Sequence, residues 1–368
     1  MALPNVIPFA SNESGSDLTS LLLKYATGKY DECARQNPVL FGTRSPVIDY
    51  ISAPHGKSWQ NLVQADVPAP EIYRSGEEPR GQKYAVDEIV STLDDTFMVD
   101  AFLAKDKNME AHFSVLDRII PGHYRSMGNW FDSRIFRTAV LAARTGSATK
   151  HGLTVHNGGN RVTNPSGSVA TRYPLTAIGA NNLRQDMRLL YQRMLEDNLM
   201  PGSFYMWMTP YLQNVLKNDG ANIFGTPSDT AASATSTLFS RDYQSANDLN
   251  KSIIMEVDGW KIVGFPNTST NGGPLPDEDY TTNGKDSDTK FQGVFSVAGT
   301  GGVGAPCCLA LASGMGGGAA VQILEHRPLE PFMVFDELKD GWTFGIRGRY
   351  GINKLHPWCA GTIEVTTS

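Results

Sequence analysis

The chain has 368 residues and a formal net charge of −6, with 40% hydrophobic and 19% charged residues. This composition is ordinary for a folded protein and argues against wholesale disorder. Basic residues are scattered, whereas a nucleic-acid binder needs clustered Lys and Arg to displace counterions from phosphate. The length suits one elaborated domain or two or three lobes.

Neither a targeting segment nor a membrane span is expected. Residues 1–14 lack the basic segment and apolar core of a signal peptide, and no stretch approaches the roughly 20 apolar residues of a membrane helix. The four cysteines are too few and too irregularly spaced for a disulfide framework: Cys33, Cys307, Cys308 and Cys359. We therefore expect synthesis in a reducing cytoplasm.

The first quarter of the chain separates into an arm and a hairpin. Residues 1–45 are expected to form an extended arm with one short helix. After an apolar run that opens at Val47, two strands at 59–63 and 84–93 flank a polar loop rich in Pro and Gly. Because these strands carry few apolar residues of their own, the hairpin is expected to project from the body and pack on a neighbour.

The middle of the chain carries the helical patterns. After a strand at 97–103, we expect a short helix at 108–120. A longer helix is predicted at 121–144, with Pro121 in the first turn, where a missing N–H costs nothing. This helix has an apolar stripe and would be about 35 Å long at 1.5 Å per residue. Residues 183–199 are predicted to form a second amphipathic helix.

The remaining segments alternate between short strands and polar stretches. Residues 147–180 are rich in Gly, Asn, Ser and Thr and are expected to form a loop or small hairpin. A strand, a proline and a helix are predicted together, with the strand at 204–208 and the helix at 211–217. Further strands are predicted at 260–266, 291–298, 306–312, 321–326, 342–352 and 360–366.

Two glycine motifs suggest nucleotide chemistry, but neither has the required context. Gly56-Lys57-Ser58 matches the end of a Walker loop, yet Ile51 stands where the first glycine belongs, and a strand instead of a helix is predicted to follow. Residues 299–304 do match G-x-G-x-x-G. However, Pro306 and the β-leaning residues after it continue poorly as a helix, and repeated βαβ units are absent.

Metal-binding and nucleophilic motifs are also weak. Cys307 and Cys308 are adjacent without a second pair at zinc spacing, and His151 and His156 fit no known ligand spacing. No G-x-S-x-G elbow or cysteine-nucleophile signature marks a catalytic triad. We therefore predict no catalytic, cofactor-binding or metal-binding residues, no cofactor, and a protein that is not an enzyme.

The order of the predicted elements resembles the major capsid proteins of tailed bacteriophages with the HK97-type fold, particularly those of short-tailed podoviruses. Four places carry the resemblance: the hairpin at 52–94, the helix at 124–143 with Gly128, the strand–Pro–helix unit at 204–216 with the strand at 259–266, and the closing strands at 349–352 and 355–362. The long polar stretches at 147–180, 218–250 and 267–290 depart from that pattern.

The resemblance implies an α+β fold with an N-terminal arm, an extended β-hairpin loop, a peripheral domain with a long spine helix, and an axial domain. The arm would span residues 1–45 and the extended loop residues 46–95. The peripheral domain would comprise 96–200 and 315–368, with the spine helix at 121–144. Residues 201–314 would form the axial domain.

The resemblance also implies a structural function. Pentamers and hexamers of the chain would assemble into an icosahedral shell around double-stranded DNA, held without sequence-specific binding. Scaffolding and portal proteins would be assembly partners, with a decoration protein as a further partner, and no membrane would be involved. The protein would be made and assembled in the bacterial host cytoplasm and would end in the virion. The acidic net charge fits a wall that must release its DNA.

The extended loop would lie across an adjacent subunit. We expect its inter-subunit contacts to involve residues on both sides of the loop, with Glu77 and Glu78 meeting arginines of the neighbour: Lys57, Trp59, Arg74, Glu77, Glu78 and Arg80. Lys57 and Lys83 also lie in the hairpin, but Lys–Asn isopeptide crosslinking is not expected in a shell of this kind.

Two alternatives remain open from the sequence. An encapsulin-type nanocompartment shell would use the same fold to enclose cargo enzymes. A nucleotide-dependent enzyme would instead use the glycine loop at 299–304.

Overall fold

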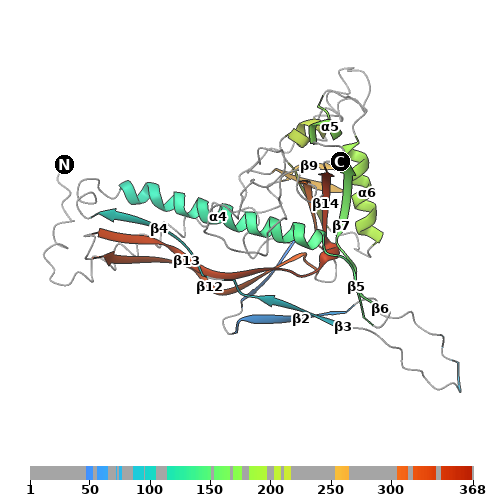
Figure 1. Cartoon of the computed structure of the whole chain (residues 1–368), viewed down its shortest axis with the longest axis horizontal. Coiled ribbons are helices and arrows are strands. Elements are labelled where there is room, and N and C mark those ends of the chain that lie inside the picture. Colours follow the sequence, from blue (N-terminus) through green and yellow to red (C-terminus); the bar gives the residue numbers. More distant parts are fainter. Residues whose placement is uncertain are drawn as a thin grey trace.

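The computed structural model describes residues 47–52, 56–64, 72, 74–76, 86–94, 96–104, 114–150, 153–165, 169–175, 182–196, 203–208, 211–216, 253–264, 305–313, 318–336 and 341–366. The expected arm, most of the hairpin loop, the strand at 291–298 and the glycine loop at 299–304 lie outside these residues. Within them, two larger sheets share one long helix (Figure 1).

The first sheet has four strands in the order β1-β12-β13-β4. Their bounds are β1 Ile48–Ser52, β12 Val321–Asp336, β13 Gly341–Lys354 and β4 Phe97–Ala104. The sheet is antiparallel except for the β1–β12 pair. The helix α4 (Ser114–Ala143) runs along one face of the sheet (Figure 1). Phe97 joins the two layers: its ring lies 4.9 Å from that of Phe131 on α4 and 5.7 Å from that of Tyr350 on β13.

The helix α4 corrects one prediction. We expected two helices that meet at Pro121, but a single helix of 30 residues contains this proline in its interior. A proline there leaves the carbonyl of Asp117 without its intrahelical N–H donor. The Pro121 ring is exposed, and the helix is buried against the sheets on both sides of this point through Ile120 and Met127. Packing along α4 therefore outweighs the local cost of the proline.

The second sheet has six strands in the order β7-β14-β11-β8-β10-β9. Their bounds are β7 Asn160–Pro165, β14 Ala360–Thr366, β11 Ala305–Ser313, β8 Ser203–Met208, β10 Trp260–Gly264 and β9 Ile253–Val257. The pairs β7–β14 and β8–β10 are parallel and the others are antiparallel. The sheet thus joins β7 and β14, which the sequence division places in the peripheral domain, to strands of the expected axial domain.

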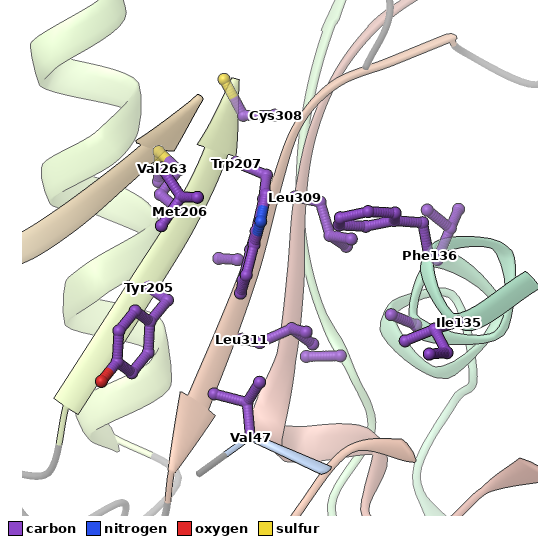
Figure 2. Packing of buried hydrophobic residues seen from close by; sticks show 14 of the residues in the cluster. Val47, Ile135, Phe136, Tyr205, Met206, Trp207, Val263, Cys308, Leu309 and Leu311 are labelled. Carbon is purple, nitrogen blue, oxygen red and sulfur yellow. The ribbon is translucent and has the colours of Figure 1, made fainter. Parts of the chain in front are cut away.

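Helices cover both faces of the six-stranded sheet. Successive residues of a strand point to opposite faces, so Phe204 and Trp207 of β8 face different helices. The ring of Trp207 lies 5.6 Å from that of Phe136 on α4, and Figure 2 shows Phe136 pointing toward Leu309 of β11. On the other face, Phe204 lies 4.9 Å from Tyr191 of α6 (Leu183–Glu196). Trp207, Phe204 and Trp260, which are among the largest fully buried side chains of the described residues, lie between these layers.

Smaller elements complete the described structure. The strands β2 (Ser58–Gln64) and β3 (Val86–Thr92) form an antiparallel hairpin on the side of the four-stranded sheet away from α4 (Figure 1). A second hairpin joins β5 (Ala148–Lys150) to β6 (Leu153–His156). The remaining helices are α5 (Val169–Arg172), residues 211–216, and the 3-10 turn η3 (Pro357–Cys359).

Two further predictions need correction. Residues 147–180 contain the expected small hairpin, but also β7, which becomes the edge strand of the six-stranded sheet. The strand expected to end at residue 326 continues to Asp336. Pro328 lies in a stretch where the register with β13 shifts, and β1 accompanies only the first residues of β12. Prolines are tolerated at bulges and free edges because no ladder hydrogen bond is lost there.

Candidate assembly surface

The β2–β3 hairpin rests on a buried polar network. Gln322 of β12 is fully buried, and its Oε1 accepts hydrogen bonds from Asn61 Nδ2 at 2.8 Å and from Ser91 Oγ at 2.7 Å. Its Nε2 donates to Asp49 Oδ2 at 2.8 Å and to Asn61 Oδ1 at 3.1 Å. One glutamine therefore joins both hairpin strands to β1 and β12, with its amide fully paired, as a buried polar group requires.

The backbone at the end of β3 is hydrogen-bonded to β13. The amide of Asp94 donates to the carbonyl of Tyr350 at 3.1 Å, and Asn353 Nδ2 donates to the carbonyl of Thr92 at 2.7 Å. A Cβ at Gly351 would collide with the same Thr92 carbonyl. Arg134 of α4 also reaches Asp94, at 3.4 Å. The base of the hairpin is thus held by polar contacts and by one close glycine approach.

A second support comes from the β5–β6 hairpin. Lys150 Nζ forms an ion pair with Asp87 of β3. The hydrogen bond from Lys150 is the main cause that holds the pKa of the Asp87 carboxyl below its ordinary range, although partial desolvation opposes it. Lys150 is half exposed, so the pair contributes little to stability by itself.

The hairpin turns three apolar side chains to solvent on a face that also carries Gln60, Glu88 and Thr92. Asn61 and Ser91 face the body through the Gln322 network, so alternation places Leu62, Val86 and Val90 on the opposite side. Leu62 is 78% exposed and Val90 50%. We call these three residues the hairpin outer face.

The four-stranded sheet has a second exposed apolar area. Phe344 of β13 packs toward α4, where its ring lies 5.8 Å from that of His123. Its neighbour Thr343 therefore points to the opposite face and pairs there with Phe102 and Val334. Phe102, Val334 and Met98 are about half exposed. These residues form the open sheet face, which lies on the same side of the sheet as the hairpin.

The sequence-predicted contact residues are only partly within the described structure. Lys57, Trp59 and Arg74 are all exposed, and the carbonyl of Lys57 accepts the Leu93 amide at 3.0 Å. Glu77, Glu78, Arg80 and Lys83 lie outside the described residues. The sequence reasoning missed the hairpin outer face and the open sheet face. Alternation within β3 was visible, but the sequence does not tell which side of a strand the body covers.

Two of the motifs that suggested a nucleotide or metal site lie in the described structure, and both are part of strands or of their turns. The strand β2 begins at Ser58, two residues after Gly56, so this loop leads into a strand, as predicted, and not into a helix. Cys307, Cys308 and Cys359 are buried free thiols. Among the described residues, no group of three or more His, Cys, Asp or Glu side chains could hold a metal ion. None of the helices in that part of the chain combines the length and apolar character needed to cross a bilayer.

No protein-family model and no curated protein matches this sequence. Solved structures do. The capsid structure of cyanophage P-SCSP1u has a TM-score of 0.58 at 17% identity, covering 88% of this chain and 86% of that chain.

The mature capsid of bacteriophage PhiM1 gives a TM-score of 0.56 at 15% identity, with 90% and 89% of the two chains covered. A chain from Mycobacterium phage Ogopogo gives 0.50 at 10% identity, with 88% and 92% covered. These matches extend over nearly the whole chain at identities where only the backbone arrangement is informative. The protein therefore has the HK97-like α+β fold of phage capsid subunits, as its order of elements predicted.

Proposed function

We propose that the chain is the major capsid protein of a tailed bacteriophage. Its pentamers and hexamers assemble into an icosahedral shell that encloses double-stranded DNA. The main observation behind this proposal is the similarity to two phage capsid structures, which cover 88% and 90% of this chain. The exposed apolar side chains of the hairpin outer face and of the open sheet face are in keeping with it, because they would be buried against neighbouring subunits in a shell. The role is structural and not enzymatic.

The hairpin outer face is proposed to dock on the open sheet face of an adjacent subunit. The chain's own hairpin already covers one end of that sheet side through Gln322, so the surface suits a β-hairpin. Leu62 and Val90 would bury their side chains against Phe102 and Val334 of the neighbour, which gives roughly 25 cal/mol for each Å² of apolar surface removed from water. Repeated around a closed shell, many modest contacts of this kind give a stable assembly.

The charged residues of the loop are proposed to lie at the rim of this contact. Lys57, Trp59 and Arg74 are exposed at the base and in the loop of the hairpin, and Glu77, Glu78 and Arg80 follow in sequence. Glu77 and Glu78 are proposed to form ion pairs with arginines of the neighbouring subunit. Rim charges set the rate and salt dependence of association more than its affinity, so the pair Glu77→Lys and Glu78→Lys is expected to change the salt dependence of assembly.

The domain division is proposed with residues 1–45 as the arm and 46–95 as the extended loop. Residues 96–200 and 315–368 form the peripheral domain around α4, and 201–314 form the axial domain. The strands β7 and β14 extend the axial sheet from the peripheral segments, so the two domains share a continuous layer. Such a shared sheet would let the domains act as one rigid unit in a shell.

Scaffolding and portal proteins are proposed as assembly partners, with a decoration protein on the finished shell. DNA is enclosed without sequence-specific contacts, in keeping with a net charge of −6. The subunit is synthesised and assembled in the host cytoplasm and resides in the virion.

Sedimentation of the purified protein tests the proposal. Wild-type chain is expected as capsomers or megadalton shells, whereas Leu62→Ser with Val90→Ser is expected to remain in smaller species. Because both residues are exposed, thermal stability should change by no more than about 0.5 kcal/mol. The matched control is Leu189→Ser on α6, which is 39% exposed and outside the proposed contact.

Two results would overturn the proposal. A wild-type protein that stays monomeric under all assembly conditions and binds a dinucleotide would favour the enzyme alternative. Shells that enclose a protein cargo and no DNA would indicate a nanocompartment. Normal shells from the Leu62 and Val90 double variant would refute the docking contact alone.

A further inference from the structure

Two histidines and a tryptophan meet where the β5–β6 hairpin joins the body. His156 ends β6, and its ring stacks with that of Trp358 at 6.2 Å. His356 precedes η3, and its ring lies 4.7 Å from the same tryptophan. The carbonyl of Trp358 accepts a hydrogen bond from Asn160 Nδ2, at the start of β7, at 3.2 Å. We call this cluster the histidine joint.

The two histidines differ in their hydrogen bonding. His156 Nδ1 lies 3.1 Å from the carbonyl oxygen of Asn157. His356 Nδ1 is buried and has no hydrogen-bond partner within the described part of the chain. Gly318 lies against the His356 ring, since an added Cβ there would be 3.5 Å from Cδ2. A buried nitrogen without a partner is uncommon in folded proteins and requires an explanation.

The joint is connected to the extended loop through contacts already described. From His156 the chain runs back along β6 to β5, where Lys150 pairs with Asp87 of the β2–β3 hairpin. In Figure 1 the β5–β6 hairpin lies between the body and β3. Any loosening between His156 and η3 would therefore reach the hairpin that carries the proposed subunit contact.

We propose that the histidine joint is an acid-responsive contact: a proton taken up from solvent by His356 loosens β6 from η3 and frees the β5–β6 support of the extended loop. The local change needs no other subunit. Its consequence for a shell, a change in how the hairpin meets its neighbour, rests on the proposed function.

The charges around His356 decide the direction of the effect. Burial lowers the pKa of His356 below its ordinary value of 6.5, Asp49 on β1 opposes this shift, and His156 on β6 adds to it. Cys359, on η3, is a buried thiol, and Gly318 and Ala319 bring no charged side chain. A protonated His356 would place a positive charge at a poorly hydrated site beside Trp358, on which the His156 ring also stacks, and burial disfavours that charge.

The sign of the pH dependence follows. The folded joint binds the proton less readily than the unfolded chain does, so its contribution to stability is complete above the ordinary value of 6.5 and falls as the pH drops toward the lower pKa of folded His356. The Lys150–Asp87 pair also weakens in acid. Because the pKa of Asp87 is lowered from 3.8, that loss occurs only in stronger acid, so it can be distinguished from the response of His356.

Hydrogen–deuterium exchange of the full chain at pH 7.5 and pH 5.5, corrected for intrinsic exchange rates, tests the joint. Peptides over residues 148–165 are expected to lose several-fold of their protection in acid, because protonation of the buried His356 destabilises its contact with η3 and β6. His356→Phe keeps a ring on Trp358 that cannot be protonated and should abolish this loss. His326→Phe on β12 is the control and should retain it. An acid response that persists in His356→Phe would overturn the proposal.

A second measurement covers the case in which His356→Phe does not fold. Deuterium exchange at the imidazole C2 position of wild-type protein reports the pKa of each histidine by mass spectrometry. The pKa of His356 is expected to lie below the ordinary histidine value of 6.5, and a pKa at or above that value would overturn the proposal. Both readouts are local, so they give an answer whether or not the chain sediments as a shell. A failure of assembly is thereby distinguished from a failure of the joint.

Discussion

The layers around Trp207 and the base of the β2–β3 hairpin are held together in opposite ways. Between α4, the six-stranded sheet and α6, large apolar side chains are fully buried and interlock (Figure 2). At the hairpin base, amides and hydroxyls around Gln322 form the contact. Apolar burial is strong and non-directional, whereas hydrogen bonds fix orientation at a small net gain. The body is therefore stabilised by apolar packing. The β2–β3 hairpin, which we also call the extension, is oriented by hydrogen bonds that add little stability.

Trp207→Ala is expected to have the largest effect, because it empties the layer between β8 and α4. Truncation of a large buried aromatic residue costs about 3–5 kcal/mol, which would appear as a marked fall in the thermal midpoint. Trp207→Phe is the matched control. Within the part of the chain that the structure describes, the buried Trp207 Nε1 has no hydrogen-bond partner, so the phenyl ring loses volume but no hydrogen bond. A cost for Trp207→Phe equal to that for Trp207→Ala would contradict this account of the core.

The body also contains a fully buried carboxylate, which sharpens the comparison. Glu364 of β14 accepts hydrogen bonds from Arg144 Nε at 2.8 Å and from Arg161 Nε at 2.6 Å. Glu364→Gln would leave two arginines facing a neutral amide, at a cost of about 3 kcal/mol, the lower end for a broken buried pair because Arg161 is partly exposed. Thermal unfolding of this variant is to be compared with Glu88→Gln, an exposed carboxylate on β3. Equal stability of the two variants would show that the buried charge is not compensated as described.

The predictability of these two regions from sequence differs for a physical reason. The strand β14 was predicted with the bounds that it has, and α6 was predicted within a few residues of its end, because their apolar periods are strong and local. The place of β7 beside β14 depends on residues some 200 positions apart, such as Asn160 and Gly361. No local pattern encodes such a pairing.

The sequence predicted where the candidate surface lies in the chain, but not which of its side chains are exposed. Gly and Pro in the loop and two weakly apolar strands indicated a projecting hairpin, and the pairing of β2 with β3 confirms the hairpin. Which side chains it exposes depends on Gln322, more than 200 residues away in the sequence. From sequence alone, Leu62 and Val90 would be assigned to the core, but the body of the protein contacts the opposite face of their strands.

Gln322→Met tests the hairpin base directly. The methionine fills the same space but leaves Asn61, Ser91 and Asp49 without their shared partner, which is expected to cost about 1–3 kcal/mol. The loss should be local, so amide exchange should rise over residues 58–64 and 86–92 while β8 and β11 stay protected. Gln185→Met on the exposed side of α6 is the control. Uniform loss of protection across both sheets would mean that the hairpin is part of the core.

Asp87→Asn should give the smallest effect on stability. The pair with Lys150 is exposed, so the global change is expected at about 0–1 kcal/mol, within reach only of careful denaturant titration. Its value lies in the hairpin: without the ion pair, exchange over residues 86–92 should rise slightly, and high salt should have the same effect on the wild type but none on the variant. A salt response that survives in Asp87→Asn would remove the β5–β6 hairpin from the supports of the extension. In that case the β2–β3 hairpin would be oriented by Gln322 and by the Thr92 contacts with β13, without the ion pair.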